Sequence, residues 1–476
     1  MKPWSMGLLL ALSACAVGPN YRAPAPLAPP SSALTAADGL AAVDATELPD
    51  RWWRLFSDPD LDRLVEKALR HNSDVRIASS NLQRARALLS EAGAARLPSS
   101  DVSAAATRGR SAPNQGGTGR VANFYSAGFD VSYEVDLFGG VSRSIEAARG
   151  DVGAAQAQLD AARVSIAAET ARTYADACGF GLQAEVARTT AKLQEQTLDL
   201  TRRLFRGGSV SQREVDQATV LVEQANAQIA SFDAEQRAAL YALAVLTGDT
   251  PANVDTAAAA CKTVPSISQL IPIGDGRGLL ARRPDVRAAE RTLAADTARV
   301  GVATAALFPS ITLLGSINLG AGDISDIGKK EGFSWSAGPL ISWNFPFIGA
   351  ARARLRENKA IAEGSLASFD RAVLTALQET QQALARLAGM LDRQTALQRA
   401  RDAAEHAAFL SRKRFDYGAD NFLDLLDAQR TLATANSAVA AAEFDRAEAQ
   451  IALFKALGGG WVDAPRPERP ALFSQP

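Results

Sequence analysis

The sequence is poor in the residues that most often carry chemistry. Its 476 residues include two histidines, three cysteines and three methionines. No spacing among them matches a zinc or haem site, so we predict no metal and no cofactor. His71 and His406 lie in charge-rich helical stretches with no Cys and no Ser motif in a turn near them, and no Gly-rich phosphate loop precedes a helix with Lys. We therefore predict that the protein is not an enzyme.

Neither sign of charge is in excess. The sequence has 51 Lys and Arg against 52 Asp and Glu, with a net charge of -1. This balance indicates no nucleic-acid partner. Beyond the first residues, no run of 18 apolar residues could form a membrane-spanning helix. If the chain crosses a membrane, we expect it to do so with β-strands.

A cysteine stands where a secretory signal would be cut. Residues 1–14 contain an early lysine, a short apolar run and small residues before Cys15, which predicts a signal peptide. The sequence LSAC fits the bacterial lipobox, so we expect Cys15 to be acylated and to act as a lipid anchor. Ala16, rather than Asp, follows it, which favours the outer membrane. An incidental cysteine after an ordinary signal peptide is the alternative.

The chain contains two copies of one pattern. Asp74 and Asp285 are 211 residues apart, as are Pro98 and Pro309. Further matches are 210 residues apart: Ser126 with Ser336, Phe205 with Phe415, Gly208 with Gly418, and Gly248 with Gly458. This period is far too long for a solenoid. Chance similarity between Ala-rich helices is the alternative, but the Pro and Gly landmarks keep register outside the helices.

Proline is absent from residues 114–250 and 347–464. Both tracts are rich in Ala, Leu, Gln, Glu and Arg, which predicts helices. A helix from Val141 to Phe205 would be roughly 97 Å long. The Gly-containing segments 206–209 and 417–420 predict sharp turns, after which an antiparallel helix returns.

Before each long helix, apolar and polar residues alternate. Phe129, Val131 and Tyr133 alternate with polar residues, and the run from Phe333 to Phe347 behaves in the same way. An apolar face with aromatic residues opposite a polar face is typical of a barrel strand between lipid and water. A half-buried hairpin of a soluble protein is the alternative. The expected lipid-facing aromatics are Phe129, Tyr133, Phe333, Trp335, Trp343 and Phe345.

Two such strand pairs give four strands, which cannot close a barrel. Open edges in hydrocarbon would leave backbone groups unpaired at several kcal/mol each. We therefore expect copies of the chain to complete one another. The predicted fold is mostly α, with two internal repeats, long helices and four transmembrane strands per protomer.

Several motifs resemble those of the TolC-like outer-membrane factors of tripartite efflux pumps, and most closely the lipoprotein NodT group. They are CAVGPNYRAP after the lipobox, WWRLFSDPDLDRLVEKAL at Trp52, YEVDLFGG at Tyr133, RRPDVRAAE at Arg282 and FLDLLDAQR at Phe422. The resemblance covers nearly the whole mature chain. A periplasmic adaptor would have one hairpin without such strand pairs, and a structural coiled coil would lack strands.

The resemblance implies a homotrimer with a twelve-stranded barrel in the outer membrane and a twelve-helix tunnel in the periplasm. The implied function is passive conduction of small molecules out of the cell. The implied partners are outer-membrane lipids, a periplasmic adaptor (membrane fusion) protein and an inner-membrane resistance-nodulation-division (RND) transporter, without nucleic acid. An outer-membrane component of type I protein secretion or of metal-ion efflux is the alternative.

The resemblance also implies the domain organisation. Equatorial segments would form a belt, and each repeat would consist of a helix, a strand pair and a helical hairpin. The expected segments are a signal peptide at 1–14, equatorial segments at 15–60, 249–278 and 458–476, repeat helices at 61–97 and 279–308, transmembrane strand pairs at 98–137 and 309–347, and periplasmic hairpins at 138–248 and 348–457.

Small residues and cysteines are expected to have three structural roles. Gly139 and Gly140 would allow the swing from strand to helix. Within the resemblance, Cys178 would lie near the belt that contains Cys261, and we expect a disulfide between them in the oxidising periplasm. Two buried free thiols are the alternative. The helix turns would contact the adaptor through small residues, unless they are simply tight turns: Gly207, Gly208, Ser209, Gly418 and Ala419.

The last motif suggests a periplasmic gate. Leu423, Asp427 and Arg430 are spaced by four and then three residues, so they share one helical face. At the matching positions, the family places an apolar ring, an acidic ring and a basic partner. Phe415 departs from the family, whose members often have a tyrosine there, so a hydroxyl-mediated latch cannot form. Ordinary helix packing at Leu423 with an exposed ion pair is the alternative.

Overall fold

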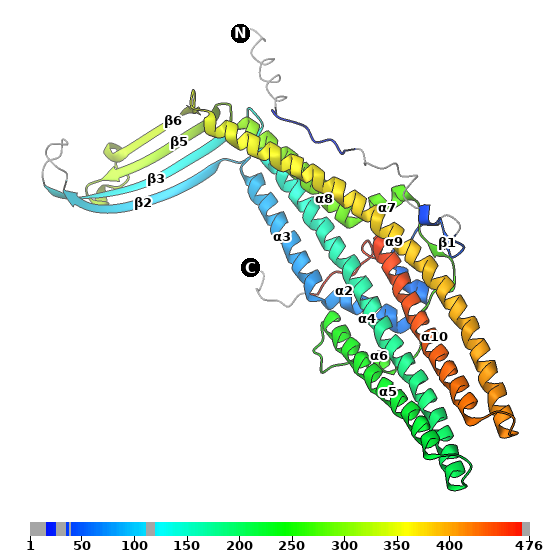
Figure 1. The fold of residues 1–476 in the computed structure, drawn as a ribbon. Helices are drawn as coiled ribbons and strands as arrows, with labels where there is room; N and C mark the ends of the chain where they lie inside the picture. Colours follow the sequence, from blue (N-terminus) through cyan, green and yellow to red (C-terminus); the bar gives the residue numbers. More distant parts are fainter. Residues whose placement is uncertain (1–15, 25–34, 38–39, 111–119, 469–476) are drawn as a thin grey trace. The chain divides into compact units, whose positions relative to one another are not determined.

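The computed structural model describes residues 16–24, 35–37, 40–110 and 120–468. Cys15 therefore lies outside the described residues. The chain divides into two compact units (Figure 1). Unit 1 comprises residues 1–25, 81–156 and 288–369, and unit 2 comprises residues 26–80, 157–287 and 370–476.

A helix, two strands and two long helices follow one another in the same order twice. The helices and strands are η3 (Thr35–Ala37), β1 (Val43–Asp44), η4 (Trp52–Phe56), α2 (Pro59–His71), α3 (Ser73–Ala94), β2 (Ser99–Arg110), β3 (Val121–Val135), α4 (Gly140–Arg206), α5 (Gln212–Leu246), α6 (Thr256–Ala260), β4 (Ile271–Pro272), α7 (Gly276–Arg282), α8 (Pro284–Ala305), β5 (Ser310–Ala321), η6 (Ile324–Asp326), η7 (Lys330–Gly332), β6 (Phe333–Ser342), α9 (Gly349–Asp416) and α10 (Phe422–Leu457). Within the described ranges, no helix is both long and apolar enough to span a bilayer.

The predicted internal repeat is confirmed. The helices α3 and α8 both have 22 residues, and the strands β2 and β5 both have 12. The helices α4 and α9 have 67 and 68 residues, and their partners α5 and α10 have 35 and 36. The predicted mostly helical fold with four longer strands is also confirmed.

One hydrogen bond of unit 2 occurs in both repeats. Asn72 Nδ2 donates to the carbonyl oxygen of Leu246 at 3.1 Å, and Arg283 Nη1 donates to that of Ala456 at 2.8 Å. Asn72 and Arg283 precede α3 and α8, while Leu246 and Ala456 lie at the ends of α5 and α10. Each bond satisfies a terminal helix carbonyl that has no partner within its own helix.

Asn72 also divides the predicted repeat helix 61–97 into two helices. Its Oδ1 accepts the backbone N–H of Asp74 at 2.8 Å, and its own N–H donates to Ala68. An asparagine that satisfies the first free N–H groups of a helix acts as an N-cap, so α2 ends and α3 begins there.

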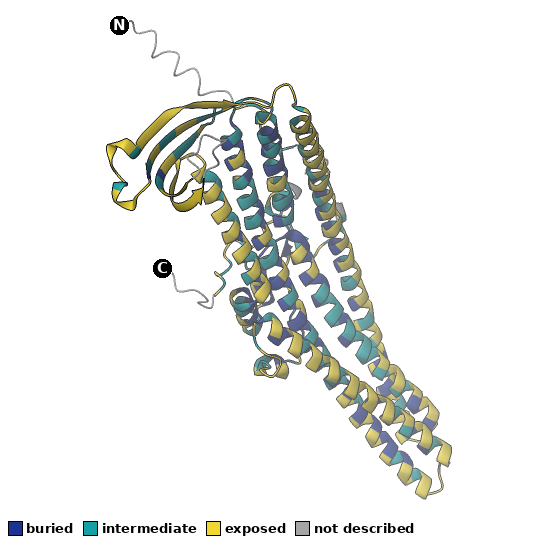
Figure 2. Ribbon diagram, turned by 90° about the vertical axis from the view of Figure 1, so that its left-hand side faces the viewer, coloured by how far each residue is buried: buried dark blue, intermediate teal, exposed yellow. Residues whose placement is uncertain are grey.

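The four longer strands form one antiparallel sheet in unit 1, in the order β2-β3-β5-β6. Val102, Phe129, Ile317 and Trp335 stand opposite one another across the strands, and these residues form part of an apolar face. The next row of paired residues faces the other side of the sheet and contains Asp101, Asp130, Ser316 and Ser336. Figure 2 shows that much of the sheet surface is exposed. The register therefore places apolar and polar residues on opposite faces.

The aromatic residues predicted to face lipid divide into two groups. Phe129, Tyr133, Phe333 and Trp335 lie in strands and share the apolar face. Trp343 and Phe345 lie outside the sheet, because β6 ends at Ser342, opposite the first residue of β5. The predicted strand alternation to Phe347 is therefore wrong beyond Ser342. The rings of Trp343 and Phe345 stack on each other at 4.5 Å.

The swing from β3 into α4 depends on Gly139 rather than Gly140. Gly139 has φ +79°, a conformation that residues with a Cβ atom rarely adopt. Asp136 caps the helix by accepting the N–H groups of Val141 and Ser142 at 2.9 and 2.8 Å. Gly140 is the first residue of α4 and lacks a positive φ, so its predicted role in the swing is wrong. A Cβ there would meet Ala305 at an ordinary 3.5 Å.

The core of unit 2 brings together parts of the three expected equatorial segments. Trp52 is fully buried, and its ring stacks on Phe454 of α10 at 4.8 Å. The strand β1 pairs in parallel with β4. Asp50 also binds the tail beyond α10, because its carboxylate accepts four backbone N–H groups at 2.7 to 3.3 Å, from Gly460, Trp461, Val462 and Asp463.

Candidate functional site

The two helix turns of unit 2 have the same construction. Gly208 and Gly418 have φ values of +75° and +72°. The following residues, Ser209 and Ala419, donate their N–H groups back to Leu204 and Arg414 at 2.9 and 2.8 Å. This is the Schellman arrangement, in which a left-handed glycine ends a helix. Gly207 lacks a positive φ, and all five small residues predicted for adaptor contact are exposed.

Each return helix begins with a capping residue. Ser211 and Glu214 form a capping box on α5, in which the N–H of Ser211 donates to Glu214 at 2.9 Å. Hydrogen bonds from Ser211 and Arg213 lower the pKa of Glu214 to about 2, so this carboxylate stays ionised. Asn421 caps α10 by accepting the N–H of Asp424 at 3.0 Å. A hollow of about 510 Å³ lies between the turns, lined by Gly208–Ser211, Glu214 and Asn421–Leu423.

The predicted gate residues lie together on an exposed face of α10. Leu423 is 43% exposed, and Arg430 Nη2 binds Asp427 Oδ1 at 2.8 Å. Both charged side chains are about two-thirds exposed, at 67% and 66%. With Gln217 and Val220 of α5, they line a hollow of about 540 Å³. In one chain, such an exposed pair contributes about 0.2 to 1 kcal/mol.

The neighbouring face of α10 packs on α4 and α5. Phe422 and Leu426 are buried in an apolar cluster with Leu198, Val215, Ala218 and Val222. Phe415 packs against this cluster, with its ring 6.0 Å from that of Phe422. The apolar environment explains how phenylalanine fits at this position.

A polar contact that the sequence pattern does not predict lies next to the predicted gate residues. Thr197 of α4 and Gln429 of α10 are joined by side-chain hydrogen bonds of 3.0 and 3.1 Å. Gln429 immediately precedes Arg430, but it points to α4. A buried Thr and a half-buried Gln give no sequence signal of their partner, because the contact joins residues 232 positions apart.

A group of charges also joins α4 to α10. Arg172 lies between three carboxylates: Glu169 at 2.6 Å, Asp176 at 3.3 Å and Glu448 at 3.8 Å. Burial raises the pKa of Asp176 to about 6, against the opposing effect of Arg172. Ionised Asp176 therefore costs the folded state free energy, and protonation below about pH 6 relieves that cost. The group consists of one guanidinium and three carboxylates and resembles a structural ion network.

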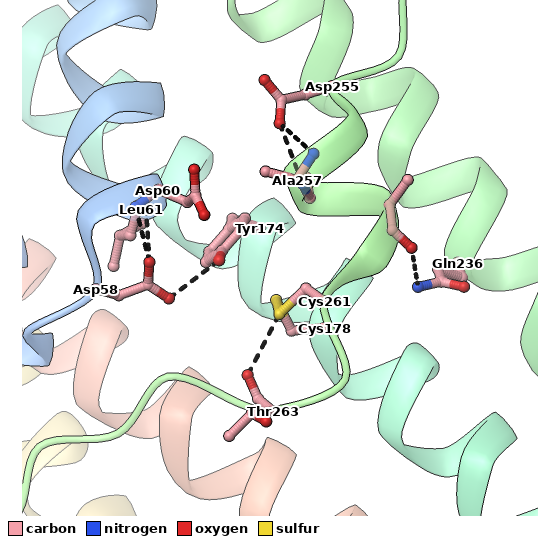
Figure 3. Close-up of a disulfide and its surroundings, with 12 residues drawn as sticks. Asp58, Asp60, Leu61, Tyr174, Cys178, Gln236, Asp255, Ala257, Cys261 and Thr263 are labelled. Carbon is pink, nitrogen blue, oxygen red and sulfur yellow. Dashed lines mark hydrogen bonds between the residues drawn. A yellow bond between two sulfur atoms is a disulfide. The ribbon is translucent and has the colours of Figure 1, made fainter.

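The structure joins Cys178 and Cys261 in a disulfide, with Cα atoms 4.8 Å apart (Figure 3). Cys178 is fully buried in α4, and Cys261 directly follows α6. A Cβ on Gly181 would lie 2.4 Å from the carbonyl oxygen of Cys261, so this glycine makes room for the segment. Gly179 instead faces Phe444 of α10.

The histidines do not form a site. His71 ends α2, with Nδ1 3.7 Å from Glu468 Oε2, and His406 is exposed on α9. Among the described residues, no group of three or more His, Cys, Asp and Glu side chains could hold a metal ion.

Relatives with known names match nearly the full chain. Nodulation protein T of Rhizobium leguminosarum bv. trifolii is 31% identical over 455 residues, covering 95% of this chain and 96% of the relative. The pyoverdine export outer membrane protein OpmQ of Pseudomonas aeruginosa is 31% identical over 474 residues, with 96% and 98% covered. The solved structure of the outer-membrane channel OprN matches with a TM-score of 0.87 and 36% identity, over 94% of this chain and all of that chain.

Two repeats, each with an amphipathic strand pair before a very long helical hairpin, define a TolC-like outer-membrane channel fold. The model of the family described as "Outer membrane efflux protein" matches residues 64–249 and 277–459, one segment for each repeat. The chain belongs to this family. It is thus an outer-membrane efflux protein, and the family is not a class of enzymes.

The bond between Cys178 and Cys261 can be tested directly in the purified protein. Non-reducing peptide mapping of the purified protein should recover Cys178 and Cys261 in one linked peptide. The loop closed by the bond spans 83 residues, so the double variant Cys178→Ser, Cys261→Ser should lose about 2 to 4 kcal/mol of unfolding free energy. Alkylation of both cysteines without prior reduction would contradict this prediction.

Proposed function

We propose that three copies of this chain form the exit duct of a tripartite efflux pump. The observation that carries this proposal is the sheet of unit 1. Its outer strands β2 and β6 each pair on one side among the described residues, and one face is apolar. In hydrocarbon, each unpaired backbone group costs several kcal/mol, so the sheet needs neighbours at both edges. Three protomers would supply twelve strands, a closed barrel with the apolar face toward lipid.

A passive duct supplies no energy for transport, so it needs partners. Energy for transport would come from an inner-membrane RND transporter, with a periplasmic adaptor joining it to this channel. The names of relatives support small-molecule cargo: OpmQ exports pyoverdine, and TtgI of Pseudomonas putida, 32% identical, belongs to a toluene efflux pump. We infer that this chain conducts small molecules as well.

We also propose that Cys15 carries the lipid anchor. Replacing it by Ala should abolish incorporation of a fatty-acid analogue, because no acceptor thiol remains. The double variant Cys178→Ser, Cys261→Ser is the matched control and should keep the label. Trimers that shift to monomer on heating should still form in Cys15→Ala, since the strands offer far more apolar surface than the lipid. Persistent labelling of Cys15→Ala would refute the anchor.

The helix turns are the proposed contacts for the adaptor. Ser209 and Ala419 are exposed and lack a positive φ, so a larger side chain there adds volume without backbone strain. Ser209→Trp and Ala419→Trp should each raise intracellular accumulation of an exported dye several-fold at unchanged trimer yield. Ser209→Ala and Ala419→Ser are the size controls and should export normally. Normal export by both Trp variants would mean that the turns merely connect helices.

The gate proposal follows from threefold symmetry. Three copies of Leu423 would form an apolar constriction, and three Asp427 carboxylates would repel one another. Arg430 would offset this repulsion. An adaptor that separates the helices would break these contacts and open the pore.

Replacing both Asp427 and Arg430 by Ala should therefore raise single-channel conductance in planar bilayers markedly and increase cellular uptake of large antibiotics. The matched control removes another exposed ion pair, Arg412 and Asp416 of α9, which are 3.3 Å apart. Its conductance should equal that of the parent protein. If the gate variant also conducts like the parent, Asp427 and Arg430 form an ordinary surface pair.

A further inference from the structure

The segment that follows Cys15 is seated on unit 1 from its first described residues. Val17 N–H donates to the carbonyl oxygen of Phe138 at 3.1 Å. A Cβ on Gly139 would lie 2.7 Å from both Cα and Cβ of Ala16. The absence of a side chain at Gly139 therefore serves two purposes, the turn into α4 and the contact with Ala16.

Two glycines bring the segment against α8. A Cβ on Gly18 would lie 2.6 Å from Cα of Gly301, a distance that real Cβ atoms do not show. The two backbones are thus in direct contact. A Cβ on Gly301 would in turn meet the side chain of Arg143 at 2.9 Å, so the same glycine also makes room for this arginine.

Arg143 of α4 binds the segment through polar contacts. Its side chain is only 6% exposed. Its Nη2 donates to Asn20 Oδ1 at 2.6 Å, its Nε to the carbonyl oxygen of Val17 at 3.4 Å and its Nη1 to Glu146 at 2.7 Å. The segment thus supplies two of the acceptors that a buried guanidinium requires.

Tyr21 fixes the segment farther along α8. Its hydroxyl donates to Glu290 Oε1 at 3.0 Å. Burial and the Glu290 carboxylate raise the pKa of Tyr21, so the phenol keeps the proton that it donates. The Arg143–Asn20 and Tyr21–Glu290 hydrogen bonds join residues 123 and 269 positions apart, so the segment can dock only after parts of both repeats have folded.

We propose that residues 16–24 form a strap that docks on α4 and α8 and holds the acylated Cys15 beside the strand-to-helix junction of its own protomer. Consecutive Cα atoms are about 3.8 Å apart, so Cys15 is one residue's reach from the Ala16–Gly139 contact. The strap would thereby bring the lipid to the end of β3, where the chain leaves the sheet. This proposal rests on the acylation of Cys15 proposed above.

A nitroxide on Arg22→Cys tests the docking in the full-length protein. Arg22 is exposed, and the acylated or disulfide-bonded native cysteines would not react. The parent should show a hindered spectrum. Gly18→Ala should give a several-fold larger mobile fraction, because its Cβ collides with Gly301. Gly328→Ala is the matched control, since Gly328 has the same φ of +93° but nothing within 4 Å of the added Cβ.

A second pair tests the Arg143 contact. Gly301→Ala displaces the arginine and should also mobilise the label, whereas Gly93→Ala, a helical glycine in open space, should not. Cys15→Ala should leave the label hindered, because protein contacts hold the strap. Equal mobility of Gly18→Ala and Gly328→Ala, or a mobile strap in Cys15→Ala, would overturn the proposal. Absence of fatty-acid incorporation in the parent would refute the anchoring role, while the label would still report docking.

Discussion

The proposed assembly depends on one constraint: among the described residues, the backbone at the two edges of the sheet has no strand partner. The strands β2 and β6 stand at the ends of the order β2-β3-β5-β6, and lipid offers their free N–H and C=O groups no partner. Neighbouring copies can supply these partners without any change in the apolar face. Threefold closure would then repeat every feature of one chain, so that one exposed leucine and one exposed ion pair on α10 would become rings around a common axis.

The residues of the proposed rings differ between the two hairpins, although the hairpins are copies of one pattern. The repeat offset of 210 places Arg213, Gln217 and Val220 at the positions of Leu423, Asp427 and Arg430. Gln217 and Val220 line the same hollow as the proposed gate residues. The helices and strands of the two repeats match, and so do the hydrogen bonds of Asn72 and Arg283. The residues that face the hollow differ between the repeats. The proposed gate therefore depends on the difference between the repeats rather than on what they share.

Most of the fold could be predicted because its signals are local and long. Proline-free tracts predict the long helices, and the alternation of apolar and polar residues predicts β3 and most of β6. One error arises where a distant partner decides, because β6 ends at Ser342, opposite the start of β5 at Ser310. Another error is local, because the side chain of Asn72 caps α3 and so ends α2. At the candidate site, the helical spacing of Leu423, Asp427 and Arg430 predicted a shared face. The Thr197–Gln429 contact could not be predicted, because neither residue type indicates a partner 232 positions away.

The contacts of unit 2 also differ in strength along its helices. At Cys178 a covalent bond ties α4 to the segment after α6, and the buried Arg283 binds Asp285, Glu379 and the end of α10. Near the turns, α10 is held by a small apolar cluster and by one neutral pair, Thr197 and Gln429. Local opening follows the weaker contacts, since segments with few buried apolar contacts unfold or move at lower free-energy cost. A movement of α10 near its turn therefore requires fewer contacts to break than a movement at its other end, which is the property that a gate at the turns requires.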